Sequence, residues 1–182
     1  MKLGHYNIER VKFLVVEDNK NMSMMVRSLL HAFGVRDVAE ATDGADALKA
    51  LKHFSADIII CDWVMQPLDG IEFVRMVRTS RDSPNPFVPI IMLTGHTELH
   101  RVTEARDAGV NEFLAKPVSA RKLYSRIEAI VEHNRQFIKF KNFFGPDRRR
   151  RALAIYRGVE HRKKQSEVIA AQEIHGATIV KK

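Results

Sequence analysis

The chain has 182 residues, a formal net charge of +8 and 45% hydrophobic residues, which is enough for one ordinary domain with a core and some additional length. No apolar run approaches the roughly 20 residues that a membrane-spanning helix needs, and the first ten residues contain no apolar signal-peptide core, so we expect a cytoplasmic protein without membrane insertion. Cys61 is the only cysteine, which excludes an intramolecular disulfide and a thiolate zinc site.

Strand-like and helix-like segments alternate along the first 135 residues. The expected strands occupy residues 12–17, 36–41, 56–62, 87–93 and 111–115, of which 36–41 is the weaker one and 56–62 the strongest. Segments with helical periodicity follow them at residues 20–33, 44–54, 70–80 and 97–109, and a last one starts near Ser119. Gly34 and Gly109 mark two helix ends. Five β–α units predict an α/β fold with a doubly wound, five-stranded parallel sheet, whose functional crevice lies beyond the carboxyl ends of the strands.

Polar side chains stand where four of the five predicted strands end. Glu17 and Asp18 follow the first strand, Asp62 ends the third, and Thr94 and Lys116 follow the fourth and the fifth. An acid after a strand is often only a helix N-cap or a solvated turn. The five side chains together, however, would meet at one edge of the sheet. Three carboxylates within a few ångströms repel one another and need a cation, and oxygen ligands favour Mg²⁺ or a similar hard ion.

This cluster predicts phosphoryl-transfer chemistry. A carboxylate that faces a metal ion can attack phosphorus and form an aspartyl phosphate. Lys116 could then offset the charge of the phosphoryl oxygens, and the Thr94 hydroxyl could donate to one of them. The repulsion between Glu17 and Asp18 is explained if the pair helps to hold the metal.

The segments VVEDN, DWVMQPLDG, TG and KP resemble the receiver domain of two-component response regulators, the CheY-like family. The resemblance implies a flavodoxin-like sheet with the strand order 2-1-3-4-5. It also implies that Asp62 accepts a phosphoryl group from the phosphohistidine of a histidine kinase or phosphotransfer protein, with Mg²⁺ as the cofactor.

The resemblance further assigns the ligands of the metal and of the phosphoryl group. The metal would be held by the side chains of Asp18 and Asp62 and by the carbonyl of Val64, and Glu17 would act mostly through a metal-bound water. The phosphoryl group would be bound by Thr94, Gly95 and Lys116. Gly95 would leave room for its backbone N–H to approach the phosphate.

The family's conformational switch pairs Thr94 with an aromatic residue three positions before the lysine, which is Phe113 in this chain. Many relatives have tyrosine at this position, and phenylalanine lacks the hydroxyl that reports the change. An aromatic residue on an edge strand also fits a plain core position, so both readings of Phe113 stay open.

One departure from the family pattern concerns the loop after Asp62. The family usually has proline four residues after the phosphoacceptor, where this chain has Gln66, and Pro67 follows one position later. The spacing from Asp62 to Gly70 is unchanged, so we expect a preserved turn with altered rigidity. We also expect Trp63, beside Asp62, to report metal binding by its fluorescence.

The positive charge is concentrated in the C-terminal part of the chain. From Phe140 to Lys182 there are 11 basic and 4 acidic residues, a net charge of +7, and the rest of the chain carries +1. We divide the chain into a receiver domain at 8–135 and a basic extension at 136–182. The last helix is expected to continue through EHNRQFIKFKNFF until Gly145 and Pro146 end it, and the remaining tail is expected to be disordered.

Three interpretations of the basic stretches DRRRR and HRKK stay open. They are a solvated tail, a docking segment for an acidic partner, and nonspecific binding to the phosphate backbone of a nucleic acid. The 38 residues after Phe144 show no three-helix pattern, which argues against a DNA-binding output domain.

The leading hypothesis is a stand-alone response regulator that binds a histidine kinase or phosphotransfer protein and an unidentified downstream protein; a homodimer is compatible with the family. Such a protein catalyses only its own phosphorylation and dephosphorylation and is not a metabolic enzyme. The alternative is a transcription regulator whose basic tail touches DNA. A phosphohydrolase of similar build would carry a second acid two residues after the nucleophile, where this chain has Val64. No glycine-rich turn for a nucleotide follows the first strand.

Overall fold

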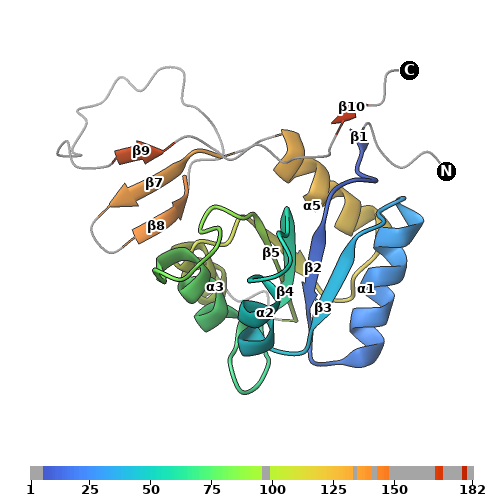
Figure 1. Ribbon diagram of the computed structural model, residues 1–182, viewed down its shortest axis with the longest axis horizontal. Coiled ribbons are helices and arrows are strands. Elements are labelled where there is room, and N and C mark those ends of the chain that lie inside the picture. Colours follow the sequence, from blue (N-terminus) through green and yellow to red (C-terminus); the bar gives the residue numbers. More distant parts are fainter. Residues whose placement is uncertain are drawn as a thin grey trace.

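The computed structural model describes residues 6–95, 99–132, 135–140, 143–147, 167–169 and 178–179. Its main sheet has five parallel strands in the order β3-β2-β4-β5-β6 (Figure 1). These strands are β2 (Phe13–Val16), β3 (Val38–Ala41), β4 (Ile58–Asp62), β5 (Ile90–Thr94) and β6 (Glu112–Ala115). This is the flavodoxin-like order expected from the sequence, because β1 (Tyr6–Asn7) is a short additional strand outside this sheet.

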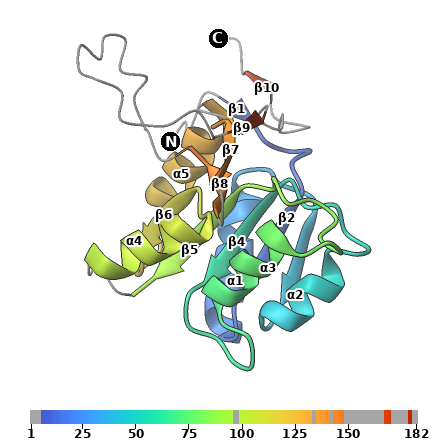
Figure 2. The same ribbon diagram turned by 90° about the vertical axis from the view of Figure 1, so that its left-hand side faces the viewer.

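Helices cover both faces of the main sheet (Figures 1 and 2). They are α1 (Lys20–Ala32), α2 (Gly44–Ala50), α3 (Gly70–Thr79), α4 (Leu99–Ala108) and α5 (Ala120–Glu132). The helices α1 and α5 pack into one apolar core, and α2, α3 and α4 pack into the other. Within the described residues, no helix combines the length and the apolar character that crossing a bilayer requires.

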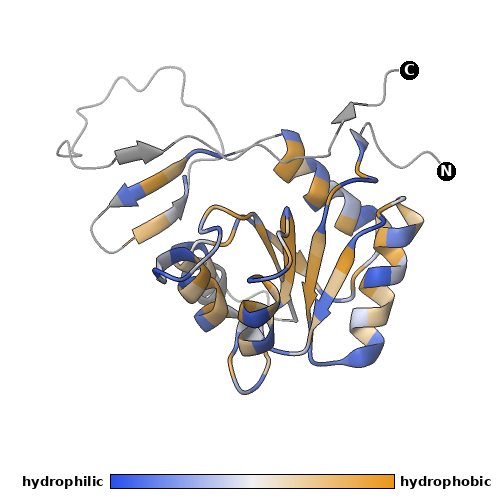
Figure 3. Ribbon diagram, in the orientation of Figure 1, coloured by the Kyte–Doolittle hydropathy of each residue, from blue (hydrophilic) through white to orange (hydrophobic). Residues whose placement is uncertain are grey.

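The central strands β2, β4 and β5 are buried on both faces, and this is why they read as apolar runs. Successive residues alternate between the two cores: Leu14 and Ile59 face α2, α3 and α4, whereas Phe13 and Ile58 face α1 and α5. Figure 3 shows the hydrophobic strands enclosed by helices whose outer faces are hydrophilic. The central strands are therefore enclosed by apolar contacts along their whole length.

Short polar side chains start three of the helices directly beyond the strands. Side-chain oxygens of Asn19, Asp43 and Asp69 accept hydrogen bonds from backbone N–H groups in the first turns of α1, α2 and α3. Gly34 and Gly109, the expected helix stops, have φ angles of +94° and +104°, a region that favours glycine. These local signals fix where the chain leaves each helix and returns to the sheet.

The predicted continuation of the last helix is wrong. The helix α5 ends at Glu132, and the residues beyond it form the antiparallel strands β7 (Phe137–Phe140) and β8 (Phe143–Pro146). The strand β9 (Glu167–Ile169) pairs with the other edge of β7, and β10 (Thr178–Ile179) pairs with β1. Because the phenylalanines have high β-propensity and find apolar partners on the domain, strand pairing wins over helix continuation. The basic stretches at 148–151 and 162–164 lie outside the described residues.

Backbone contacts hold the loop that follows β4. Trp63 N–H donates to Leu93 O at 3.1 Å, and Gly70 N–H donates to Trp63 O at 3.0 Å. A Cβ atom added at Gly70 would lie 2.1 Å from the carbonyl oxygen of Asp62. This position therefore accepts only glycine, because the start of α3 lies against the end of β4. The Gln66–Pro67 peptide bond within the loop is cis.

We predict that Gly70→Ala destabilises the protein by roughly 3 kcal/mol, because the new methyl group can be accommodated only if the start of α3 moves away from Asp62. Urea unfolding followed by circular dichroism measures this. Gly95→Ala is the matched control, since a Cβ atom there would meet nothing within 4 Å. Equal stability of the two variants would contradict the close approach at Gly70.

Candidate functional site

The ends of β2 and β4 bring three carboxylates together. One oxygen atom each from Glu17, Asp18 and Asp62 lies within 4.8 Å of the other two. Glu17 is 2% exposed and Asp62 is 6% exposed, whereas Asp18 is exposed to solvent. The side chains that the sequence placed at one edge of the sheet therefore do meet there, and two of the three charges are buried.

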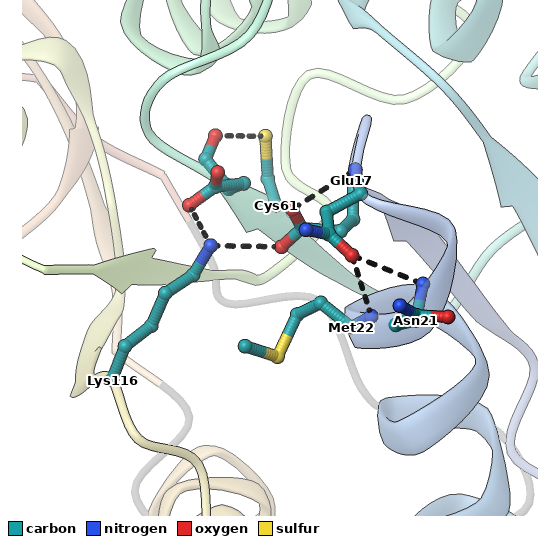
Figure 4. Close-up of polar contacts among 7 residues, drawn as sticks. Glu17, Asn21, Met22, Cys61 and Lys116 are labelled. Atoms are coloured by element: carbon teal, nitrogen blue, oxygen red, sulfur yellow. Dashed lines mark hydrogen bonds and ion pairs between the residues drawn. The ribbon is translucent and has the colours of Figure 1, made fainter.

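Lys116 supplies the positive charge in this cluster. Its Nζ lies 2.8 Å from Asp62 Oδ1 and 3.0 Å from Glu17 Oε2, so one ammonium group bridges two carboxylates (Figure 4). Its backbone N–H donates to Thr94 O at 2.8 Å, which ties the end of β6 to the end of β5. Burial of Lys116 lowers its pKa, but the hydrogen bonds that it donates to the carboxylates of Asp62 and Glu17 outweigh this, and its pKa is raised. Lys116 is therefore protonated at neutral pH.

Glu17 is the member of the cluster whose charged form is destabilised. Burial and the charge of Asp62 raise its pKa, and the contact with Lys116 only partly offsets this. Its Oε1 also accepts a hydrogen bond from Asn19 N–H at 3.3 Å. A single lysine shared by two buried carboxylates leaves the site short of positive charge, and a divalent cation would supply it.

The remaining predicted site residues surround the cluster. Thr94, 4% exposed, ends β5, and the strand register places it one position beyond the partner of Asp62. Gly95 follows it in open space, and Val64 is 58% exposed after Trp63. Phe113 is half-buried and packs against the core formed with α2, α3 and α4, which fits its core reading. The switch reading of Phe113 stays a prediction.

The donor set fits a hard metal ion. Carboxylate oxygens are the ligands that Mg²⁺ and Ca²⁺ prefer. The sulfur of Cys61 lies nearby but is buried, and burial raises the pKa of this thiol well above its usual value. Its S–H donates to Asp62 O at 3.2 Å, so it acts as a neutral hydrogen-bond donor and not as a thiolate ligand.

The sequence analysis missed the role of Asn19 beside the cluster. Its side-chain oxygen accepts hydrogen bonds from Asn21 N–H and Met22 N–H at 3.0 and 3.1 Å, which starts α1, while its own backbone N–H donates to Glu17. Figure 4 shows Asn21 and Met22 at this helix start, with dashed lines for the hydrogen bonds that their N–H groups donate. Asparagine directly after the acidic pair and before a helical segment is a recognisable N-cap signal.

The sequence pattern of the response regulator receiver domain matches residues 13–128. The chain belongs to this family. The match begins at β2 and ends within α5, so it contains the five-stranded sheet and all five residues of the predicted cluster. The chain is therefore a two-component response regulator, and membership of this family implies interaction with histidine kinases or phosphotransfer proteins.

Curated relatives include chemotaxis proteins. The chain is 35% identical over 122 residues to the chemotaxis protein CheY of Pseudomonas aeruginosa, a match that covers 67% of this chain and 97% of that protein. It is 32% identical over 124 residues to CheY-3 of Vibrio cholerae, covering 68% and 94%. Both matches leave about a third of this response regulator without a counterpart.

Solved structures of receiver domains are similar to the same part of the chain. The CheY4 structure from Vibrio cholerae matches with a TM-score of 0.61 and 32% identity, covering 66% of this chain and 98% of that one. The receiver domain of a sensor histidine kinase from Pseudomonas aeruginosa, described with a magnesium ion coordinated in its active-site cleft, matches with a TM-score of 0.57 and 30% identity, covering 65% and 94%. The parallel sheet is thus a CheY-like receiver fold.

We predict that Glu17→Gln stabilises the metal-free protein by about 1 kcal/mol at pH 7, because it removes a buried charge that Lys116 only partly compensates. The raised pKa of Glu17 means that its ionisation costs stability. This cost is absent below about pH 4.5, the ordinary value, grows as the pH rises from there to the raised value, and is constant above it. The gain from Glu17→Gln should therefore shrink towards acidic pH.

Urea unfolding at pH 7 and pH 5 with a chelator present tests this prediction. Glu72→Gln, at an exposed position in the first turn of α3, is the matched control and should change little. A less stable Glu17→Gln protein at pH 7 would mean that the Lys116 pair outweighs the burial cost.

Proposed function

We propose that Asp62 accepts a phosphoryl group from the phosphohistidine of a histidine kinase or phosphotransfer protein, and that this modification changes the binding of a protein partner. The observation that carries the proposal is the buried Asp62 carboxylate, held 2.8 Å from Lys116 Nζ within a cluster of three acids. The ordinary role of a buried acid, an ion pair with one cation, would not need Glu17 and Asp18 beside it.

The chain's own residues have distinct tasks in this reaction. A carboxylate oxygen of Asp62 forms the new bond to phosphorus while the phosphorus–nitrogen bond of the donor breaks. Lys116 shifts its contact from the carboxylates to a phosphoryl oxygen and offsets the added charge. Thr94 and the backbone N–H of Gly95 donate hydrogen bonds to the same group. All of these residues follow strands of one sheet, which holds their spacing without reorganisation.

The acidic cluster also supports a proposal for the cofactor, which is Mg²⁺. Asp18, Asp62 and the Val64 carbonyl would hold it, and Glu17 would act mostly through a bound water. When bound, the ion neutralises charge on the carboxylates and on the phosphoryl oxygens. The magnesium ion described for the similar receiver domain of a sensor histidine kinase supports this assignment.

The proposed protein is a signalling switch and not a metabolic enzyme. Its catalysis would be confined to its own phosphorylation and dephosphorylation. The residue two positions after Asp62 is Val64, which is 58% exposed and cannot supply the second acid of a phosphohydrolase. The switch would use Thr94 and Phe113. The DNA-binding alternative gains no support from the relatives, which are chemotaxis proteins.

We predict that acetyl phosphate with Mg²⁺ adds about 80 Da, one phosphoryl group, to the wild-type protein but not to Asp62→Asn. Intact-mass spectrometry checks this, and peptide mapping assigns the modified residue. Asp82→Asn, at an exposed loop position, is the matched control and should be labelled like the wild type. Unchanged labelling of Asp62→Asn would remove Asp62 as the phosphoacceptor.

We predict that Mg²⁺ changes the fluorescence of Trp63, the only tryptophan, which is 6% exposed and adjacent to Asp62. Asp18→Asn should weaken the apparent affinity by roughly tenfold or more, because one charged oxygen ligand is lost. Asp57→Asn, at the opposite end of β4, should titrate like the wild type. Equal affinities for all three proteins would show that the acidic cluster does not bind the ion.

A further inference from the structure

We propose that the hairpin of β7 and β8, here called the C-terminal hairpin, is a docked reporter of the phosphorylation state: it is held on the receiver while Asp62 is unmodified and is loosened when Asp62 carries a phosphoryl group. The inference rests on the proposed function and goes beyond it, since it names the chain's own extension as the first element that reads the switch. The hairpin lies beyond the end of the main sheet opposite to the acidic cluster (Figures 1 and 2).

A buried guanidinium at the end of α3 forms the centre of the docking site. Arg78 is 3% exposed, and burial lowers its pKa to about 9, so it stays charged at neutral pH. It donates to Gly109 O at 3.1 Å, to Pro86 O at 2.8 Å and to Asn111 Oδ1 at 3.1 Å. These acceptors belong to the segments that enter β5 and β6. One side chain therefore joins three segments of the receiver.

One aromatic ring of the hairpin lies over this guanidinium, and a second ring packs beside it. The ring centroid of Phe137 lies 5.3 Å from Arg78 Cζ, a cation–π distance. Phe137 and Phe144 also pack against Phe87, with ring centroids 5.2 Å apart in each pair. Phe137 is 2% exposed, so the hairpin contributes a core residue to the receiver. The hairpin thus shields the charge of Arg78 from water.

Two glycines show how closely the hairpin approaches α4. A Cβ atom added at Gly145 would lie 3.0 Å from Gly109 Cα, and one added at Gly109 would lie 3.1 Å from Arg78 Nε and 3.2 Å from Phe144 O. The backbones of β8 and of the α4 end are therefore in direct contact. Such a contact cannot adjust gradually, because close-packed interfaces respond to small shifts by separating or repacking.

The hairpin root is tied to β6 as well. Arg135, which precedes β7, pairs with Glu112 Oε1 at 2.6 Å, and Arg126 of α5 lies 3.4 Å from Glu112 Oε2. Glu112 is 5% exposed and starts β6, directly before Phe113. Asn111 Oδ1 also accepts from Ile90 N–H, at the start of β5. The amino ends of β5 and β6 therefore hold the hairpin.

The same two strands carry Thr94 and Lys116 at their carboxyl ends. In this structure Lys116 contacts the Asp62 and Glu17 carboxylates directly, and the hairpin is docked over Arg78. A phosphoryl group on Asp62 takes the place of that contact and draws Thr94 and Lys116 towards itself. Strands of four and five residues span about 15 Å, and a shift along either one would reach the Arg78 acceptors.

Hydrogen exchange of the wild-type chain tests the proposal directly. The backbone amides of β7 and β8 are compared with and without beryllofluoride plus Mg²⁺, a reversible mimic of a phosphoryl group on a carboxylate. We expect hairpin amides to exchange about fivefold faster or more with the mimic, while amides of α1 keep their rates. Unchanged or slower exchange in the hairpin overturns the proposal.

Hairpin docking and binding of the phosphoryl mimic must affect each other equally, and this supplies a second test. Variants that weaken docking, Phe137→Ala and Gly145→Ala, should bind beryllofluoride more tightly by a similar factor, followed through the fluorescence of Trp63. Phe54→Ala removes a half-buried ring from the α2 side and should leave the affinity unchanged. Equal affinities for all of these proteins overturn the coupling even if the docking variants remain folded.

The two proposals fail in different ways. If beryllofluoride does not bind the wild type and acetyl phosphate does not label Asp62, the proposed function is wrong and the hairpin has nothing to report. If Asp62 is labelled but the exchange of the hairpin is unaffected, phosphorylation stands and only the reporter role is lost.

Discussion

The structure of this response regulator depends on one electrostatic constraint, the burial of two carboxylates at the carboxyl edge of a parallel sheet with a single lysine between them. Glu17 and Asp62 are almost fully enclosed, and Lys116 bridges them. Buried charges are stable only when paired and hydrogen-bonded. The strand ends must therefore keep their spacing, and the contact of Gly70 with Asp62 O is part of how they do.

The constraint also explains why the site suits a reversible modification. Lys116 forms ion pairs with two carboxylates, and the pKa of Glu17 stays raised despite its contact with Lys116. A cluster whose negative charge is incompletely compensated is stabilised by each added cation and by a rearrangement of its lysine. If the proposed function holds, the cost of the buried Glu17 charge is an example of a functional site that reduces stability.

The five-stranded sheet and its helices could be predicted because their signals are local. The central strands β2, β4 and β5 are buried on both faces and read as apolar runs, and the alternation with helices indicates a parallel sheet. The site followed from the same step, since carboxyl ends of parallel strands share an edge. Sequence spacing alone could not show that Lys116 contacts Glu17 as well as Asp62, because that geometry depends on how β6 lies beside β5.

The hairpin could not be predicted in this way, because its signals are ambiguous and its partners are distant. Phe137, Phe140 and Phe144 recur at spacings of three and four, the period of a helix face, whereas aromatic residues as a type favour strands. What decides between them is Phe87, about 50 residues earlier in the chain. Arg78 did carry a signal that was overlooked, since it stands seven residues after Ile71 and four after Val74 on the buried face of α3.

Buried charge is compensated in opposite ways at the amino ends and at the carboxyl ends of the strands. The charged Arg78 is stabilised by the chain itself, through backbone carbonyls, an amide oxygen and the ring of Phe137. In the proposed function, the acidic cluster is completed by a cation from solution and by the phosphoryl group on Asp62. The strands β5 and β6 run from the end of the sheet that holds Arg78 to the end that holds the acidic cluster. A displacement of either strand at the acidic cluster would therefore reach the hydrogen-bond acceptors of Arg78.

A buried guanidinium is poorly suited to gradual displacement, since each lost acceptor leaves a charged donor unpaired in a medium of low polarity. The hairpin over Arg78 should therefore respond to the site in two discrete states and not by small adjustments.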